Sequence, residues 1–211
     1  MTLAEILTFA FVASLLVMSP GPNGVLIAKT VPTSGRAAGF ANVAGFIAAF
    51  YIHGTLSVLG ITLILVQSAT AFAIVKYLGA AYLAWIGIRA LIAAIKGEAP
   101  PTASPAKRAR TLRAAFIEGL LTNALNPKVS MFYLAAFPQF ITLGETTPAA
   151  SFLLVTVHAA INAVWFAAMV LLLGRLSAFA RSGPAQRWLK GITGVVFIGF
   201  GAKLATTRLT A

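Results

Sequence analysis

The chain has 211 residues, 59% of them hydrophobic and only 9% charged, with a mean hydropathy of +0.92 and a net charge of +12. Soluble domains are about half apolar and about a quarter charged, so this composition excludes an ordinary water-soluble domain and favours a membrane protein of about six helices. The basic balance does not require a nucleic-acid partner, because cytoplasmic loops of membrane proteins collect Lys and Arg.

Six apolar segments, separated by polar or basic residues, follow one another along the chain. We expect an all-α membrane protein whose helices cover about residues 4–28, 36–66, 71–95, 112–137, 149–173 and 189–206. The N-terminus lacks the basic start of a cleaved signal, so the first segment is expected to remain as a span. The second is longer than a span requires, which predicts a tilted or irregular helix. Pro138 is expected to end the fourth.

Lysine and arginine are distributed unequally over the two sides of this array. Loops one, three and five with the adjoining helix ends hold twelve of them: Lys29, Arg36, Arg89, Lys96, Lys107, Arg108, Arg110, Arg113, Arg175, Arg181, Arg187 and Lys190. The opposite side holds Lys76, Lys203 and Arg208. The positive-inside rule therefore predicts that the odd-numbered loops are cytoplasmic and that both termini face outward, unless a re-entrant segment moves one end.

The second half of the chain weakly repeats the first. Pro22 and Pro127 are 105 residues apart, and so are the two histidines, His53 and His158. A tandem copy of three helices must insert upside down, which predicts two inverted three-helix repeats at 1–95 and 112–211, joined by a basic cytoplasmic linker at 96–111. Chance similarity between apolar sequences is the alternative.

The first apolar segment is interrupted by the sequence Ser19, Pro20, Gly21, Pro22 and Asn23. Each proline lacks a backbone N–H and clashes with the carbonyl one turn back, and glycine permits angles that other residues avoid. The result is a helix end inside the bilayer, which is tolerated only where protein or a water-filled cavity covers it.

Asn126, Pro127 and Lys128 form the matching break in the fourth segment. Both breaks lie roughly 20 Å into their spans and enter from opposite faces. Freed carbonyls can bind an ammonium, and a helix restarting at Asn23 can present N–H groups to a carboxylate, so the pair suits a zwitterion such as an amino acid. The alternative is two structural proline kinks.

Other polar residues in the apolar segments have two interpretations each. Lys128 is costly at that depth and is expected to be buried or to face a cavity, since its side chain is too short to reach the outer surface. His53 is a candidate for proton relay or substrate contact, or a hydrogen-bonded core histidine; His158 is a weaker candidate. Glu118 suits an interfacial ion pair or proton coupling. Asn42 and Asn162 suit substrate contact or helix packing.

The sequence does not favour an enzyme. It has no carboxylate pair at acid/base spacing, no zinc-protease or phosphate-loop motif, no cysteine, and only two histidines with four carboxylates for a metal site. We therefore expect no catalytic residues, no cofactor, no metal and no nucleic-acid partner.

The chain resembles the lysine-exporter (LysE/RhtB) family, specifically its RhtB and leucine-exporter branch. The likeness rests on residues 19–23, 120–128, 137–140 and 197–201, which read SPGPN, LLTNALNPK, FPQF and FIGFG, and on the segment 77–87. It covers almost the whole chain in order. Many family members have Asp where this chain has Asn23, which argues against a strongly cationic substrate and against proton coupling at that position.

The resemblance implies an exporter of neutral amino acids or their derivatives (homoserine, threonine or leucine type) in the bacterial inner membrane, driven by proton antiport. The expected site comprises Ser19, Pro20, Gly21, Pro22, Asn23, His53, Asn126, Pro127 and Lys128. The alternatives are a small-ion or metal exporter of the same superfamily and an uncoupled channel-like protein. The sequence leaves open the individual substrate, the coupling ion and whether the chain forms a homo-oligomer.

Overall fold

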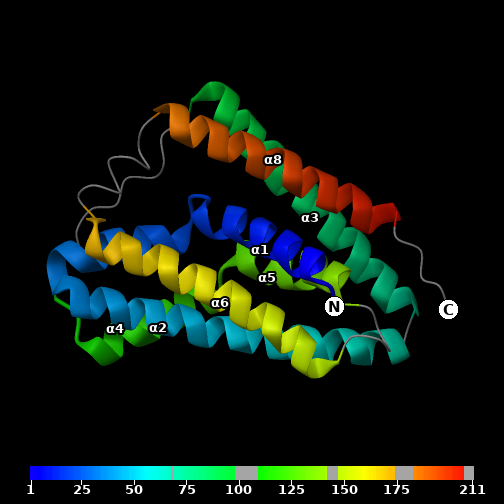
Figure 1. Ribbon diagram of the computed structural model, residues 1–211, viewed down its shortest axis with the longest axis horizontal. Coiled ribbons are helices and arrows are strands. Elements are labelled where there is room, and N and C mark those ends of the chain that lie inside the picture. Colours follow the sequence, from blue (N-terminus) through cyan, green and yellow to red (C-terminus); the bar gives the residue numbers. More distant parts are fainter. Residues whose placement is uncertain (68, 98–108, 142–146, 174–182, 207–211) are drawn as a thin grey trace.

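The computed structural model describes residues 1–67, 69–97, 109–141, 147–173 and 183–206, and all regular structure in these ranges is helical (Figure 1). The elements are α1 (Leu3–Met18), α2 (Pro22–Gln67), α3 (Ala69–Lys96), α4 (Leu112–Ala124), α5 (Pro127–Met131), η1 (Phe132–Ala136), η2 (Phe137–Phe140), α6 (Pro148–Leu171) and α8 (Gly183–Thr206). The expected all-α class is confirmed. Most of the expected 96–111 linker lies outside the described residues, and so do residues 142–146 and 174–182 between the later expected helices.

Four of the described helices are long and apolar enough to cross a membrane, and they lie at 22–59, 76–96, 148–171 and 187–206. The other two expected spans are not single helices. The first expected segment divides into the 16-residue α1 and the start of α2. The second expected segment begins at Arg36 as predicted, because α2 consists of two helices that meet at a kink directly before this residue; the first of the two continues past the expected end near residue 28. Only Gly35, with φ 79° and ψ 175°, departs from helical geometry inside α2.

The fourth expected segment is also divided. α4 ends at Ala124, α5 restarts at Pro127, and the chain then winds through the π-helical η1 and the 3₁₀-helical η2. The expectation that Pro138 ends this segment was wrong by about one turn, because Pro138 lies at the start of η2, where its missing N–H costs no hydrogen bond.

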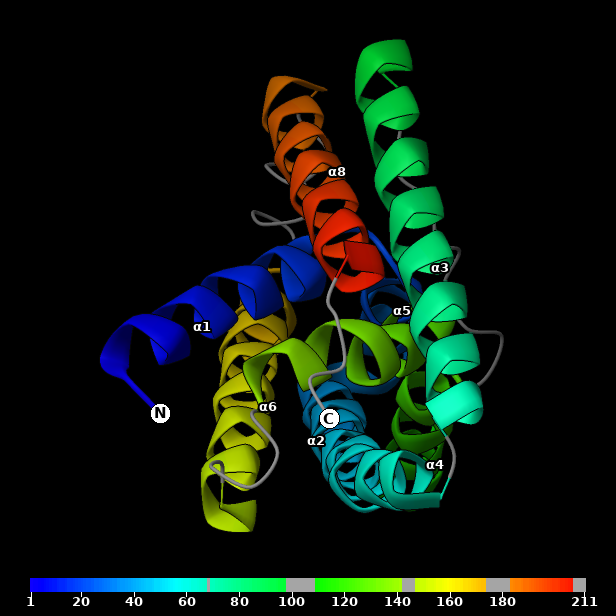
Figure 2. The ribbon, with the colours of Figure 1, turned by 90° about the vertical axis from the view of Figure 1, so that its right-hand side faces the viewer.

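The helices form three groups (Figures 1 and 2). α3 and α8 pack along each other as a pair, and α2, α4 and α6 form a second group on the other side. α1 and the α5–η1 segment lie between them, with α1 contacting both α6 and α8 and η1 contacting α2, α3 and α8. The helix before the first break and the helix after the second break therefore occupy the middle of the molecule.

Close helix crossings depend on glycine at two places. A Cβ on Gly45 of α2 would overlap the carbonyl oxygen of Phe116, and one on Gly119 of α4 would overlap that of Asn42. Between α3 and α8, a Cβ on Gly87 or on Gly194 would lie 2.7 Å from the carbonyl oxygen of the other. Such small-residue contacts hold membrane helices together by backbone packing.

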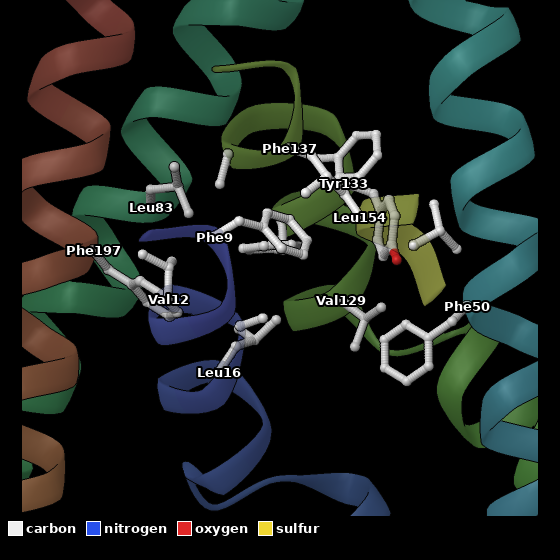
Figure 3. Close-up of a cluster of buried hydrophobic side chains, with 14 of the residues drawn as sticks. Phe9, Val12, Leu16, Phe50, Leu83, Val129, Tyr133, Phe137, Leu154 and Phe197 are labelled. Carbon is white, nitrogen blue, oxygen red and sulfur yellow. The ribbon is translucent and has the colours of Figure 1, made fainter. Parts of the chain in front are cut away.

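An aromatic core fills the space between the three groups (Figure 3). Phe9 of α1 is fully buried, with its ring centroid 5.9 Å from those of Phe132 and Phe137. Phe50 of α2 and Phe197 of α8 enclose the same cluster from opposite sides. Burial of these rings fixes the broken segments against the long helices.

Candidate functional site

The first break begins at the end of α1, where the next turn lacks a backbone N–H donor. Pro20 has no N–H, so the carbonyl of Leu16, one turn earlier, has no helical partner. Ser19 caps the helix in extended geometry with φ −66° and ψ 142°, and its N–H donates to the Leu15 carbonyl at 3.0 Å. Its hydroxyl donates to the Leu16 carbonyl at 2.8 Å. Pro22 then opens α2 at a position where proline is favoured.

Lys128 reaches this break from α5. Its ammonium donates to the Leu16 carbonyl at 2.9 Å, to the Ser19 carbonyl at 3.0 Å and to the Ser19 hydroxyl at 2.9 Å. These three bonds use all three donors of the ammonium. The group that binds the freed carbonyls is thus a side chain of the second break, and the two breaks are joined directly.

Asn126 sets the direction of Lys128. Its side-chain oxygen accepts from the Lys128 N–H at 3.1 Å, and its backbone carbonyl accepts from Val129 and Ser130 at 3.0 Å. Pro127 occupies the first turn of α5. Asn126 is therefore the N-cap of the restarted helix, and its cap defines where the Lys128 side chain leaves the backbone.

Gly21 provides space beside the ammonium. A Cβ at this position would lie 2.9 Å from Lys128 Nζ and 3.4 Å from its Cε. No positive φ is involved, because Gly35 and Gly97 alone show one among the described residues. The role of Gly21 is thus steric: a larger residue would press on the end of the Lys128 side chain.

An amide pair lies next to the junction. Asn23 donates its side-chain N–H to the side-chain oxygen of Asn123 at 3.0 Å, and Asn123 donates in turn to the Phe46 carbonyl at 2.9 Å. Both asparagines are buried. Within the described chain, the side-chain oxygen of Asn23 accepts no hydrogen bond, so this buried acceptor is open to another donor.

The two histidines both contact the ring of Tyr133. The His53 ring is stacked on Tyr133 with centroids 5.6 Å apart and planes 14° apart, and His158 is stacked on Tyr133 at 5.6 Å and 9°. His53 also donates from Nε2 to the Asn123 carbonyl at 3.2 Å. Both nitrogens of the fully buried His158 and the Tyr133 hydroxyl have no partner in the part of the chain that is described.

The remaining polar candidates lie elsewhere. Glu118 forms an ion pair with Arg110, whose Nε lies 2.6 Å from its carboxylate. Asn42 donates to the Ala115 carbonyl at 2.6 Å, across the crossing of α2 and α4. Asn162 is buried on α6, one turn after His158, and its amide has no partner among the described residues. No three His, Cys, Asp or Glu side chains come together as a metal site within the described ranges.

Comparison with known proteins gives a family. The LysE type translocator family matches residues 14–208. The chain belongs to the LysE-type translocators. It is a multi-pass membrane transport protein and not an enzyme.

Named relatives of this translocator are similar over nearly their whole length. The threonine efflux protein of Escherichia coli (strain K12) is 28% identical over 204 residues, which cover 96% of this chain and 98% of the relative. The leucine efflux protein of Klebsiella pneumoniae is 29% identical over 208 residues, covering 96% and 95%. An uncharacterized membrane protein of Pseudomonas aeruginosa is 31% identical over 208 residues, with the same coverage. No solved structure matches the chain.

Two residues of the translocator's junction were absent from the site expected from sequence. Asn123 connects Asn23, Phe46 and His53. Tyr133 is stacked with both histidines. Asn123 stands three residues before Asn126, so a second asparagine in the same helix turn was the available signal. Tyr133 carried no signal, because one more aromatic residue in an apolar segment resembles ordinary core.

Proposed function

We propose that this translocator exports neutral amino acids or closely related small metabolites, of the threonine, homoserine or leucine type, from the bacterial cytoplasm. The observation that carries the proposal is the junction of the two helix breaks, where Lys128 bonds the carbonyls of Leu16 and Ser19. Interrupted helices that meet inside the membrane are a common way to build the substrate site of a secondary transporter. The names of the threonine and leucine efflux relatives support the amino-acid class.

The proposed binding residues are those expected from the sequence together with Asn123. They are Ser19, Pro20, Gly21, Pro22, Asn23, His53, Asn123, Asn126, Pro127 and Lys128. None of them is acidic, and Glu118 is paired with Arg110 instead. A substrate with a cationic side chain would find no counter-charge here, whereas amides and carbonyls suit a neutral one.

Proton exchange is the proposed source of energy, and the stack of His53, Tyr133 and His158 supports it. Histidine is the side chain that titrates nearest to neutral pH. The stack lies in the core beside the Asn23–Asn123 pair, to which His53 is bonded through the Asn123 carbonyl. A proton carried by the stack would therefore act on the same asparagine that holds Asn23.

The proposed architecture is six spans arranged as two inverted three-helix repeats in the inner membrane, with the odd-numbered loops cytoplasmic. The order of elements supports it, because a broken segment followed by two long helices occurs twice. Tyr51 and Thr156, 105 residues apart, share a hydrogen bond of 3.2 Å between their hydroxyls, as equivalent positions beside a two-fold axis would. Substrate then enters from the cytoplasm and leaves outside by alternating access of the two halves.

Transport into everted membrane vesicles tests the proposal. Vesicles with an acidic interior should accumulate labelled threonine, homoserine or leucine saturably, and they should lose this uptake when the pH gradient is collapsed. Vesicles without the protein are the control. Non-saturable, gradient-independent flux would indicate a channel instead, and metal sensitivity of a deletion strain without any amino-acid uptake would indicate a metal exporter.

A further inference from the structure

Three oxygen atoms at the first break form a compact site for a cation. The carbonyls of Leu16 and Ser19 and the Ser19 hydroxyl all lie within 2.9–3.0 Å of one nitrogen, Lys128 Nζ. The Leu16 carbonyl is available because Pro20 cannot donate to it. The oxygens therefore exist independently of Lys128, and another ammonium of the same size could bind them.

Lys128 reaches the site with no carboxylate beside it. Its three bonds go to neutral oxygens, and the ion pair of Arg110 with Glu118 is the salt bridge that the described residues form. The side chain is only partly buried. A flexible four-carbon stem and the missing Cβ of Gly21 allow its end to move without displacing backbone.

We propose that Lys128 is a tethered substitute for the substrate's ammonium. Without substrate, its Nζ donates hydrogen bonds to the three oxygens. When a substrate binds, the substrate's α-ammonium takes these oxygens, and the released Lys128 pairs with the substrate's carboxylate. This inference rests on the proposed function and specifies its substrate class as molecules that carry a free amino group and a free carboxylate together.

The charges explain why both groups are needed. A molecule without an ammonium, such as an N-acetyl amino acid, cannot replace Lys128 on the oxygens. A simple amine can, but it leaves the Lys128 charge in the interior with no partner, which is unfavourable in a low-dielectric setting. Only a zwitterion has both an ammonium that can replace Lys128 on the oxygens and a carboxylate that can pair with the displaced Lys128.

The oxygen site is tested by itself with the variant Lys128→Ala in the purified full-length protein. Removal of Lys128 leaves the oxygens empty, so the thermal unfolding midpoint should fall and should rise again with n-propylammonium. Tetramethylammonium at the same concentration cannot donate hydrogen bonds and should have no effect. Wild type and Lys29→Ala, an exposed lysine of α2, should not respond to either ion. If the thermal unfolding midpoint of Lys128→Ala did not rise with n-propylammonium, the proposal would be overturned.

The exchange step is tested with wild type, which avoids any folding defect. Unlabelled leucine, N-acetyl-leucine and the amine obtained by decarboxylating leucine are compared as inhibitors of labelled leucine uptake in everted vesicles. Each truncated molecule should inhibit at least about tenfold less well, because a site built for hydrogen-bonded groups rejects analogues that lack them. Equal inhibition by either one would contradict the exchange. Absence of all amino-acid uptake would instead contradict the proposed function, while the unfolding measurement would still test the oxygen site.

Discussion

Asn23 donates its side-chain amide to the side-chain oxygen of Asn123, 3.0 Å away, and so joins the start of α2 to the end of α4. The bond places the residue after the first break against the residue just before the second. The side-chain amide of Asn123 is fixed in this orientation, since its nitrogen donates to the Phe46 carbonyl. The identity of residue 23 is thus coupled to the geometry of both breaks.

Replacing Asn23 by aspartate should change substrate preference. The carboxylate cannot donate to Asn123, so the pair is lost and a negative charge enters the site. We expect neutral amino-acid uptake to fall about tenfold or more, since the loss of a buried hydrogen-bond partner and the gain of a charge both act on it. Lysine should become a better inhibitor of the remaining uptake. Asn23→Ser loses the bond without adding charge, so it should reduce uptake without any gain for lysine; identical profiles for both variants would contradict this account.

Asn126→Ala should impair transport because it changes the position of the Lys128 side chain. The variant removes the α5 N-cap, which costs about 1 kcal/mol of stability, and it frees the direction of the Lys128 side chain. Asn126→Ser keeps a capping oxygen and should retain most of the transport rate. Rates are compared at matched expression in everted vesicles. Full transport by Asn126→Ala would remove this residue from the site.

The contacts of His158 with Tyr133 predict that a substitution of His158 changes proton-driven transport without lowering stability. His158→Phe keeps a ring among Phe9, Phe50, Phe132 and Tyr133 and removes two buried nitrogens that have no partner among the described residues. The unfolding midpoint should therefore be maintained or raised. Uptake driven by a pH gradient should fall, while exchange of labelled for unlabelled substrate without a gradient continues. If gradient-driven uptake were unchanged, the histidine would be a packing residue only.

The crossing of α2 and α4 predicts large effects of one added methyl group. Gly45→Ala and Gly119→Ala each place a Cβ against backbone atoms of the facing helix, which cannot move aside as a side chain can. We expect a loss of about 1–3 kcal/mol or more in each. Gly199→Ala is the matched control, because a Cβ there meets nothing within 4 Å. Thermal unfolding in detergent measures all three, and similar midpoints would contradict the packing described for this crossing.

The breaks themselves could be predicted from sequence, because proline has a local effect that needs no knowledge of neighbours. Pro20, Pro22 and Pro127 lie where helices end or restart. The helix boundaries were harder to predict from the sequence. The helix that restarts at Pro22 continues past the expected end near residue 28 as far as the kink at Gly35, and its length depends on how α2 packs against its neighbours.

The partners across the junction could not be predicted. The sequence indicated that freed carbonyls would bind an ammonium, but a substrate was the expected donor. The position of Lys128 on those carbonyls depends on how α5 packs beside α1, which is a tertiary property. Tyr133 was missed for the same reason, since its importance comes from the residues that it contacts, whereas Asn123 was indicated only by its position three residues before Asn126.

Uptake of labelled neutral amino acids into everted vesicles with an imposed acidic interior tests the central claim most directly. The account predicts saturable accumulation of at least one of threonine, homoserine and leucine, which stops when the gradient is collapsed and which Asn126→Ala diminishes. Vesicles that contain the folded protein and accumulate no neutral amino acid or homoserine derivative would contradict it.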